Sequence, residues 1–135
     1  MPNVLAIIRL SEDATGESHF DEYQVEQPDT PFAPPALPFM VSPPEKASAY
    51  SIISIPAGWV GKRHRSPHRQ ICFCFAGALK VTASDGTVRV ITPGRLWLMG
   101  RLWLMTDVTG KGHESEVASD VAFEAALVFV DSAGP

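Results

Sequence analysis

Short runs of alternating apolar and polar residues, separated by glycine and proline, recur along most of the chain. Alternation with a period of two is typical of β-strands, because successive side chains point to opposite faces of a sheet. No window shows a convincing helical period. The pattern therefore predicts an all-β fold that forms a small barrel, with strands at residues 4–9, 19–25, 49–55, 79–83, 87–91 and 121–130.

Two of these predictions depend on particular residues. Asp85-Gly86 stands between two alternating runs, and this pair is typical of a tight hairpin because glycine accepts a positive φ. In the last strand, Glu124 is expected to face outward. The opposite face of that strand is apolar and consists of Val121, Phe123, Ala125, Leu127 and Phe129.

Polar and metal-competent groups occupy the even positions of the segment 61–77. A continuous strand would direct all of them to one face: His64, Ser66, His68, Gln70, Cys72 and Cys74. The other face would carry Ile71, Phe73 and Phe75, which suit packing. Pro67 interrupts this ladder because proline has no N–H to donate, so the alternation is firm only from Gln70 onward.

The N-terminal part contains a proline-rich segment at residues 28–44, with seven prolines in seventeen residues. This density excludes a helix and favours an extended path. The segment is too apolar for a solvated linker, because it also contains Phe32, Leu37, Phe39, Met40 and Val41. We therefore expect one domain in which residues 1–47 form strands and an ordered arm, laid over the barrel of residues 48–135 or over a partner subunit.

The sequence GRLWLM occurs twice in succession, at residues 94–99 and 100–105. Chance identity over six residues is negligible, which leaves a recent tandem duplication, a cloning or sequencing artefact, or a deliberate insertion. Six is an even number, so an extended strand would keep its inward and outward faces. No matching duplication exists opposite, and one copy is expected to form a loop bent at Gly100 or to run past the barrel as an edge.

Composition narrows the class of protein. The 135 residues match one domain, and 45% hydrophobic with 19% charged residues is typical of a folded soluble protein. A net charge of −4 argues against binding to nucleic acid or to an anionic membrane, because both need an excess of basic charge. Without a secretion signal or an apolar stretch of bilayer length, a cytoplasmic location is expected.

Cys72 and Cys74 lie two residues apart on one strand, which is poor geometry for a disulfide, so reduced thiols are expected. They are either soft ligands or a redox pair, or small hydrophobic residues of the core, and the base rate of burial favours the core. A second group of interest is basic: Lys62, Arg63, Arg65 and Arg69. These residues contact nucleic acid, form a rim that attracts an anionic small molecule, or are a solvated strand end. The acidic chain and the lack of interleaved aromatic residues favour the rim over nucleic acid.

One constellation has ligand chemistry, and it consists of His64, His68, Gln70 and His113. Three imidazoles suit a divalent transition metal such as Zn, Fe, Ni, Cu or Mn, and Gln70 can supply a weak oxygen ligand or hydrogen-bond a bound water or substrate. In the alternative, the same histidines hydrogen-bond one another and a carboxylate in a metal-free pocket. Asp107 and Lys111 are interpreted as turn residues that place His113 at the barrel mouth.

The spacing around these residues resembles the two motifs of the cupin family. Gln70 precedes Gly77 by the six intervening residues of the first motif and takes its Glu position, while His64 and Ser66 take its two His positions. The second motif is matched by Gly86, Pro93-Gly94 and His113. The resemblance covers residues 48–130 and implies a double-stranded β-helix, or jelly-roll-like, barrel with a small-molecule pocket.

What the resemblance implies for function takes two forms. In the first, the protein is a metal-dependent enzyme of the dioxygenase, isomerase or lyase type that acts on a small organic acid or phenol. His64, His68 and His113 would then bind the metal, and Gln70 would be the catalytic group that orients substrate or water. In the second, the protein is a non-catalytic module that binds or senses a small molecule without metal. A homodimer is expected in either case, because the arm and the GRLWLM repeats are more apolar than the surface of a small monomer.

Overall fold

The computed structural model describes residues 3–66, 68–93, 102–105 (backbone only) and 110–130. These residues form strands and no helix, so the all-β prediction is confirmed, and none of them belongs to a helix that could cross a membrane. The strands are β1 Asn3–Glu12, β2 Ser18–Gln27, β3 Asp29–Thr30, β4 Phe39–Met40, β5 Ala47–Ile55, β6 Val60–His64, β7 Gln70–Ala76, β8 Leu79–Ala83, β9 Val88–Ile91, β10 Leu102–Met105, β11 His113–Val117 and β12 Phe123–Val130.

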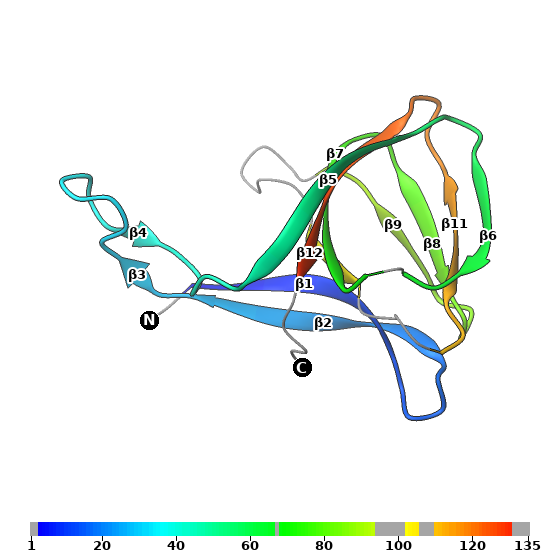
Figure 1. Cartoon of the computed structure of the whole chain (residues 1–135), viewed down its shortest axis with the longest axis horizontal. Helices are drawn as coiled ribbons and strands as arrows, with labels where there is room; N and C mark the ends of the chain where they lie inside the picture. Colours follow the sequence, from blue (N-terminus) through cyan, green and yellow to red (C-terminus); the bar gives the residue numbers. More distant parts are fainter. Residues whose placement is uncertain (1–2, 67, 94–101, 106–109, 131–135) are drawn as a thin grey trace.

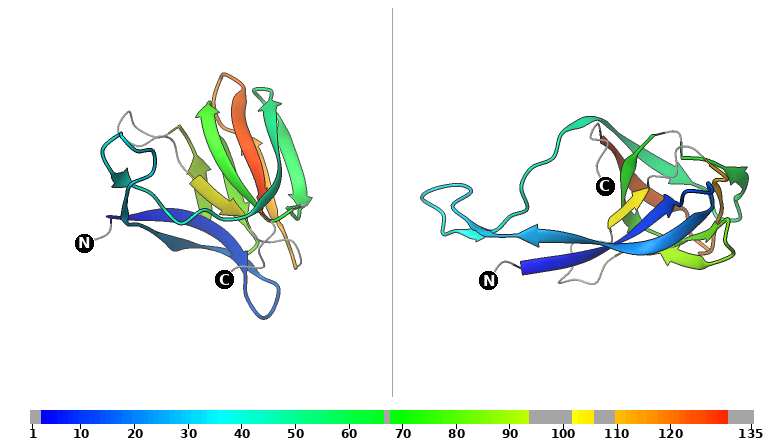
Figure 2. Two further views of the ribbon diagram at one scale, coloured as in Figure 1. Left: turned by 60° about the vertical axis from the view of Figure 1, so that its left-hand side comes forward. Right: turned by 90° about the horizontal axis from the view of Figure 1, so that it is seen from below.

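Two larger sheets face each other and enclose the core (Figures 1 and 2). One has six strands in the order β2-β1-β10-β7-β12-β5, and the other has four in the order β6-β11-β8-β9. Pairing is antiparallel except between β1 and β10, which are parallel. Among the described residues neither sheet closes on itself into a barrel, since β2 and β5 are the edges of the first and β6 and β9 those of the second.

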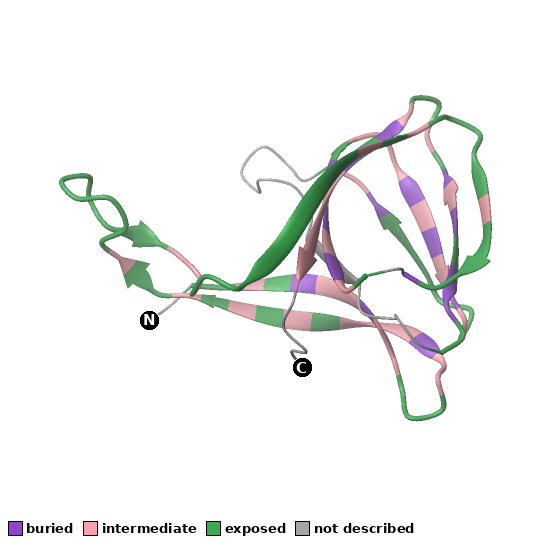
Figure 3. Cartoon of the chain, viewed as in Figure 1, coloured by how far each residue is buried: buried purple, intermediate pink, exposed green. Residues whose placement is uncertain are grey.

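The core lies where the inward faces of the two sheets meet (Figure 3). Phe123, Leu10 and Ile91 are fully buried there, together with Val81. In β12, Glu124 is exposed between buried Phe123 and Ala125, as the alternation predicts. The strand begins only at Phe123, however, and Val121 precedes it in a turn and is exposed.

The segment that carries the polar even positions is divided between the two sheets. β6 ends at His64 in the four-stranded sheet, and β7 begins at Gln70 in the six-stranded sheet. From Gln70 the predicted alternation is confirmed, with Gln70, Cys72 and Cys74 buried and the odd-numbered side chains on the opposite face. Both cysteines are free thiols in the core cluster, as expected.

The predicted hairpin at Asp85-Gly86 joins β8 to β9, and Gly86 adopts a φ of 91°. The turn is closed by the N–H of Gly86, which donates to the carbonyl of Ala83 at 3.0 Å. Asp85 accepts hydrogen bonds from the backbone N–H and the hydroxyl of Thr87, which fixes the residue that follows. A tight hairpin is therefore confirmed at this position.

The proline-rich arm leaves the two sheets and projects away from them (Figure 1). Its short strands β3 and β4 pair with each other, and residues 31–40 are all exposed. The rings of Phe32 and Phe39 lie 5.5 Å apart within the arm. Residues 31–40 of the arm thus make contacts with one another and project away from the sheets, whereas Pro43 and Pro44 line a groove beside the six-stranded sheet. Contact of the arm with a partner subunit remains a prediction.

The second GRLWLM copy supplies β10, which lies in the middle of the six-stranded sheet between β1 and β7. Leu102–Met105 therefore form a central strand and not an extended edge. Residues 94–101, which include the first copy and Gly100, lie outside the described residues, and so does the predicted bend.

Candidate functional site

A pocket of about 350 Å³ opens between the two sheets. Its walls are largely apolar and include Ile53, Ile55, Trp59, Leu79, Ile91, Leu127 and Phe129. Its polar lining contains all four predicted site residues, together with two serines and a cysteine: His64, His68, Gln70, His113, Ser66, Ser115 and Cys72. Residues from both sheets and from the break between β6 and β7 thus meet at one site.

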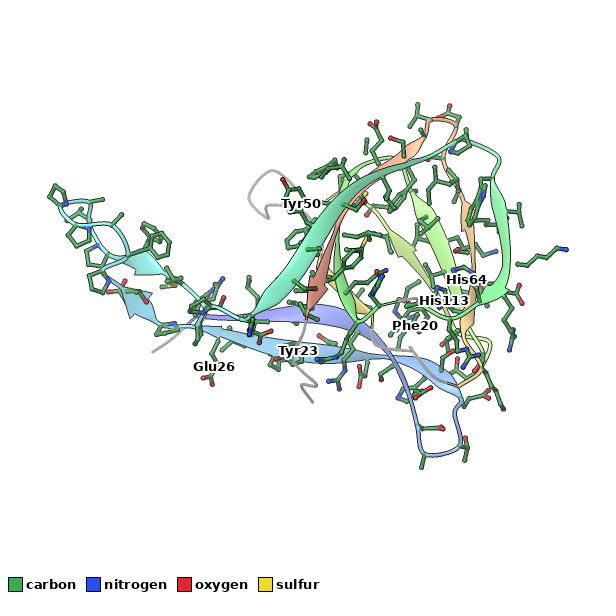
Figure 4. All side chains as sticks on the ribbon, viewed as in Figure 1. Phe20, Tyr23, Glu26, Tyr50, His64 and His113 are labelled. Atoms are coloured by element: carbon green, nitrogen blue, oxygen red, sulfur yellow. The ribbon has the colours of Figure 1, made fainter. Side chains whose placement is uncertain are left out.

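His64 and His113, two residues of this polar lining, lie next to each other (Figure 4). They are directly opposite each other on the paired strands β6 and β11, and their ring centroids are 4.6 Å apart. His113 is buried, whereas His64 is exposed. Nδ1 of His64 lies 2.7 Å from the carbonyl oxygen of Lys62, which can only accept, so Nδ1 is the donor and Nε2 of the neutral ring is left as an acceptor.

His68 and Gln70 belong to the other side of the pocket. The ring of His68 packs against the ring of Phe129, with centroids 4.3 Å apart. Gln70 is the first residue of β7 and is buried, with its backbone opposite Phe129 of β12. His68 therefore lines the pocket next to an aromatic ring, and only two of the three histidines form a ring pair.

The entry to β11 is held by a close backbone approach at Gly112. Its φ is 79°, and a Cβ added there would overlap the carbonyl oxygen of His64. The carbonyl of Gly112 accepts a 2.6 Å hydrogen bond from Oγ of Ser18, which is fully buried. Ser18 in turn accepts from the N–H of Ser84 and donates its own N–H to that side chain.

The turn between β1 and β2 contacts the loop that precedes β11. The N–H of Lys111 donates to the carbonyl of Gly16, and Nζ of Lys111 lies 2.6 Å from Glu17. Lys111 is thus a loop residue beside His113, as predicted, but Asp107 lies outside the described residues. Sequence reasoning missed Ser18 and Glu17, because their partners in this loop, Gly112 and Lys111, are 94 positions away and no local pattern marks them.

Among the described residues, basic side chains lie near the pocket but no acidic side chain lines it. Burial, with a smaller contribution from the neighbouring Cys74, raises the pKa of Cys72 to about 12, so this thiol is neutral at ordinary pH. Outside, Lys62 and Arg65 are exposed next to His64, and Arg63 lies 3.7 Å from Glu114. The site therefore offers imidazole, amide and hydroxyl groups with a basic rim.

The described residues do not assemble a metal site of the usual kind. No three or more of their His, Cys, Asp or Glu side chains form a group that could hold a metal ion. His64 and His113 supply two adjacent imidazoles, while Ser66 stands where the cupin motif has its second histidine. A bound metal would need further ligands from Gln70, water or substrate, and metal binding stays a prediction.

No protein-family model matches the chain, and the search of curated proteins finds no match.

Proposed function

We propose that the chain is a cupin whose pocket binds a small, largely apolar molecule with an anionic or hydroxyl group. The cupin assignment is supported by the positions of the motif residues, since His64 and His113 lie on paired strands and Gln70 lies on the facing sheet. The volume of about 350 Å³ lies near the lower end of the range for small-molecule sites.

The observation that carries the proposal is the absence of any carboxylate from the described lining of a pocket that contains three histidines and a glutamine. An anion in such a pocket meets hydrogen-bond donors without like-charge repulsion, whereas a cation would be desolvated without a counter-charge. A phenolic hydroxyl can instead donate to Nε2 of His64. The apolar walls then favour an aromatic or aliphatic body.

The test compares benzoate, phenol and benzylamine, which are similar in size and differ in charge. Benzoate or phenol at a hundred times Kd should stabilise the native state by about 2.7 kcal/mol and so raise the Tm, and benzylamine should not. His113→Ala and the exposed His64→Ala should weaken this effect. His19→Ala, in β2 and outside the pocket lining, is the matched control. A larger effect of benzylamine, or none from any probe, would contradict the proposal.

The 4.6 Å separation of the His64 and His113 rings favours a second candidate, the metal-dependent enzyme. The same melting experiment distinguishes it when Zn(II), Fe(II), Ni(II), Cu(II) or Mn(II) replaces benzoate after treatment with a chelator. An increase in Tm that is lost in His64→Ala and His113→Ala but kept in His19→Ala supports the enzyme. Equal Tm values with metal and with chelator would contradict the metal-dependent enzyme and favour the binding module without metal.

A further inference from the structure

Among the exposed apolar side chains of the described residues, two groups lie on separate parts of the chain. One part is the outward face of the six-stranded sheet, on the side away from the pocket. The other is the tip of the proline-rich arm. Contiguous exposed apolar surface is rare on monomeric proteins and marks interaction sites.

The outward face is built from rows that cross three strands. Val128 of β12 lies opposite Tyr50 of β5 and Ile71 of β7, and Ala126 lies opposite Ile52 and Phe73 in the next row. Tyr50 points away from the space between the sheets (Figure 4) and is exposed. A groove of about 620 Å³ runs along this face. Ile71, Phe73 and Val128 line it together with Pro43 and Pro44 of the same chain, and Glu26 and Glu45 are also in its lining.

The arm has the complementary properties. Residues 30–44 contain no charged side chain, and Leu37 at the tip is 84% exposed. Phe32, Phe39 and Met40 are exposed beside it. The backbone of the arm around β3 and β4 projects away from the two sheets (Figures 1 and 3), so this part of the arm does not lie on the outward face of its own chain.

We propose that two copies of the chain associate by exchanging arms, so that the uncharged arm of each lies on the outward face of the six-stranded sheet of the other. One chain carries both halves of the contact, which is the requirement for a self-complementary twofold interface. A standard interface buries about 800 Å² per partner. That is about a tenth of the 8290 Å² of accessible surface of the chain. This inference is independent of the ligand in the pocket.

Single lysine substitutions test both halves of the contact. Leu37→Lys changes the arm, and Ile52→Lys changes the outward face at a side chain that is 62% exposed. Val60→Lys is the matched control, because Val60 is 69% exposed on β6 of the other sheet. Light scattering at micromolar concentration should give a dimer for the wild type and for Val60→Lys. Each of the other two variants should dimerise at least tenfold more weakly, with wild-type circular dichroism.

Mixing the two weakened variants separates arm exchange from other dimers. In a mixed dimer one contact joins the intact arm of the Ile52→Lys chain to the intact face of the Leu37→Lys chain, and the other contact carries both lysines. Because one lysine already breaks a contact, a second lysine in the same contact adds little, and the mixture should associate more tightly than either variant alone. A monomeric wild type would overturn the proposal. A Leu37→Lys variant that dimerises normally, or a mixture no tighter than its components, would show association without arm exchange and would also overturn it.

Discussion

Gly112 shows how closely the two strands that carry the paired histidines approach each other. Its positive φ and the adjacent carbonyl of His64 leave no room for a side chain. Gly86 has a similar φ of 91°, but nothing lies within 4 Å of the position that its Cβ would take. The two glycines therefore separate the effect of backbone conformation from the effect of close approach.

We predict that Gly86→Ala lowers the free energy of unfolding by about 1 to 2 kcal/mol, from the positive φ alone. Gly112→Ala should cost about 2 to 5 kcal/mol, because over-packing adds to the same strain. It should also weaken benzoate binding by displacing His113 from His64, whereas Gly86→Ala should not. Urea unfolding and calorimetric titration measure both quantities. Equal losses of stability in the two variants would contradict the close approach.

Alternation in residues 61–77 selected His64, His68 and Gln70 from the sequence, motif spacing added His113, and the structure brings all four to one pocket. Alternation explains this success for Gln70, because residues two apart share a face. The packing of His68 on Phe129 was not predictable, since it depends on a strand sixty residues later in the chain. Ser18 was missed for the same reason, because its hydrogen bond to Gly112 is purely tertiary.

Individual strands were predicted more accurately than the breaks between them. The runs that became β5, β8 and β9 were bounded by clear turn residues. The separation of β6 and β7 into different sheets was not predicted, because Pro67 indicates an interruption without indicating where the chain goes next. The parallel pairing of β1 with β10 has no local signal either, since neither sequence carries information about the other.

The duplication permits a test at the level of one strand. Deletion of residues 100–105 leaves the sequence RLWLM between Pro93 and Thr106, so an identical strand sequence can take the place of β10. We predict that this deletion variant folds, with a Tm equal to or higher than that of the wild type, because it shortens the connection from β9. A melting curve and an NMR spectrum of the histidine side chains check this. Unfolding, or displacement of His113 relative to His64, would show that both copies are needed.

Carboxylates that fix turns and strand pairs determine how the whole molecule responds to acid. Hydrogen bonds and attraction from Arg9 hold the pKa of Asp21 below its ordinary value, and two atoms of the guanidinium contact the carboxylate at 2.9 and 2.7 Å. Hydrogen bonds from Thr15 and Thr87 lower the pKa of Asp13 and of Asp85 in the same way. Each carboxylate therefore stabilises the fold while it is ionised.

Because these folded-state pKa values are lowered, their contribution is present above the unfolded pKa of about 4 and is lost as the pH falls through the folded values. We predict that the free energy of unfolding decreases below about pH 4. Asp21→Asn should reduce this dependence and cost no more than about 1 kcal/mol at pH 7, since the pair is partly exposed. Glu22→Gln, next to it, is the control. Urea titrations from pH 2 to 7 check the result, and an unchanged slope in Asp21→Asn would contradict it.

The parallel pairing of β1 with β10 also determines when the six-stranded sheet can form during synthesis, because β10 is synthesised long after β1. During synthesis at about 5 to 20 residues per second, on the order of ten seconds separates Ile8 from its partner Trp103. Until then the inner edge of β1 presents open backbone groups. Residues 94–99 leave the ribosome before residues 100–105 and carry the same sequence. Two segments of identical sequence can therefore pair with β1 during synthesis. The strand β10 of the folded protein comes from the second of them, Leu102–Met105, which is synthesised later.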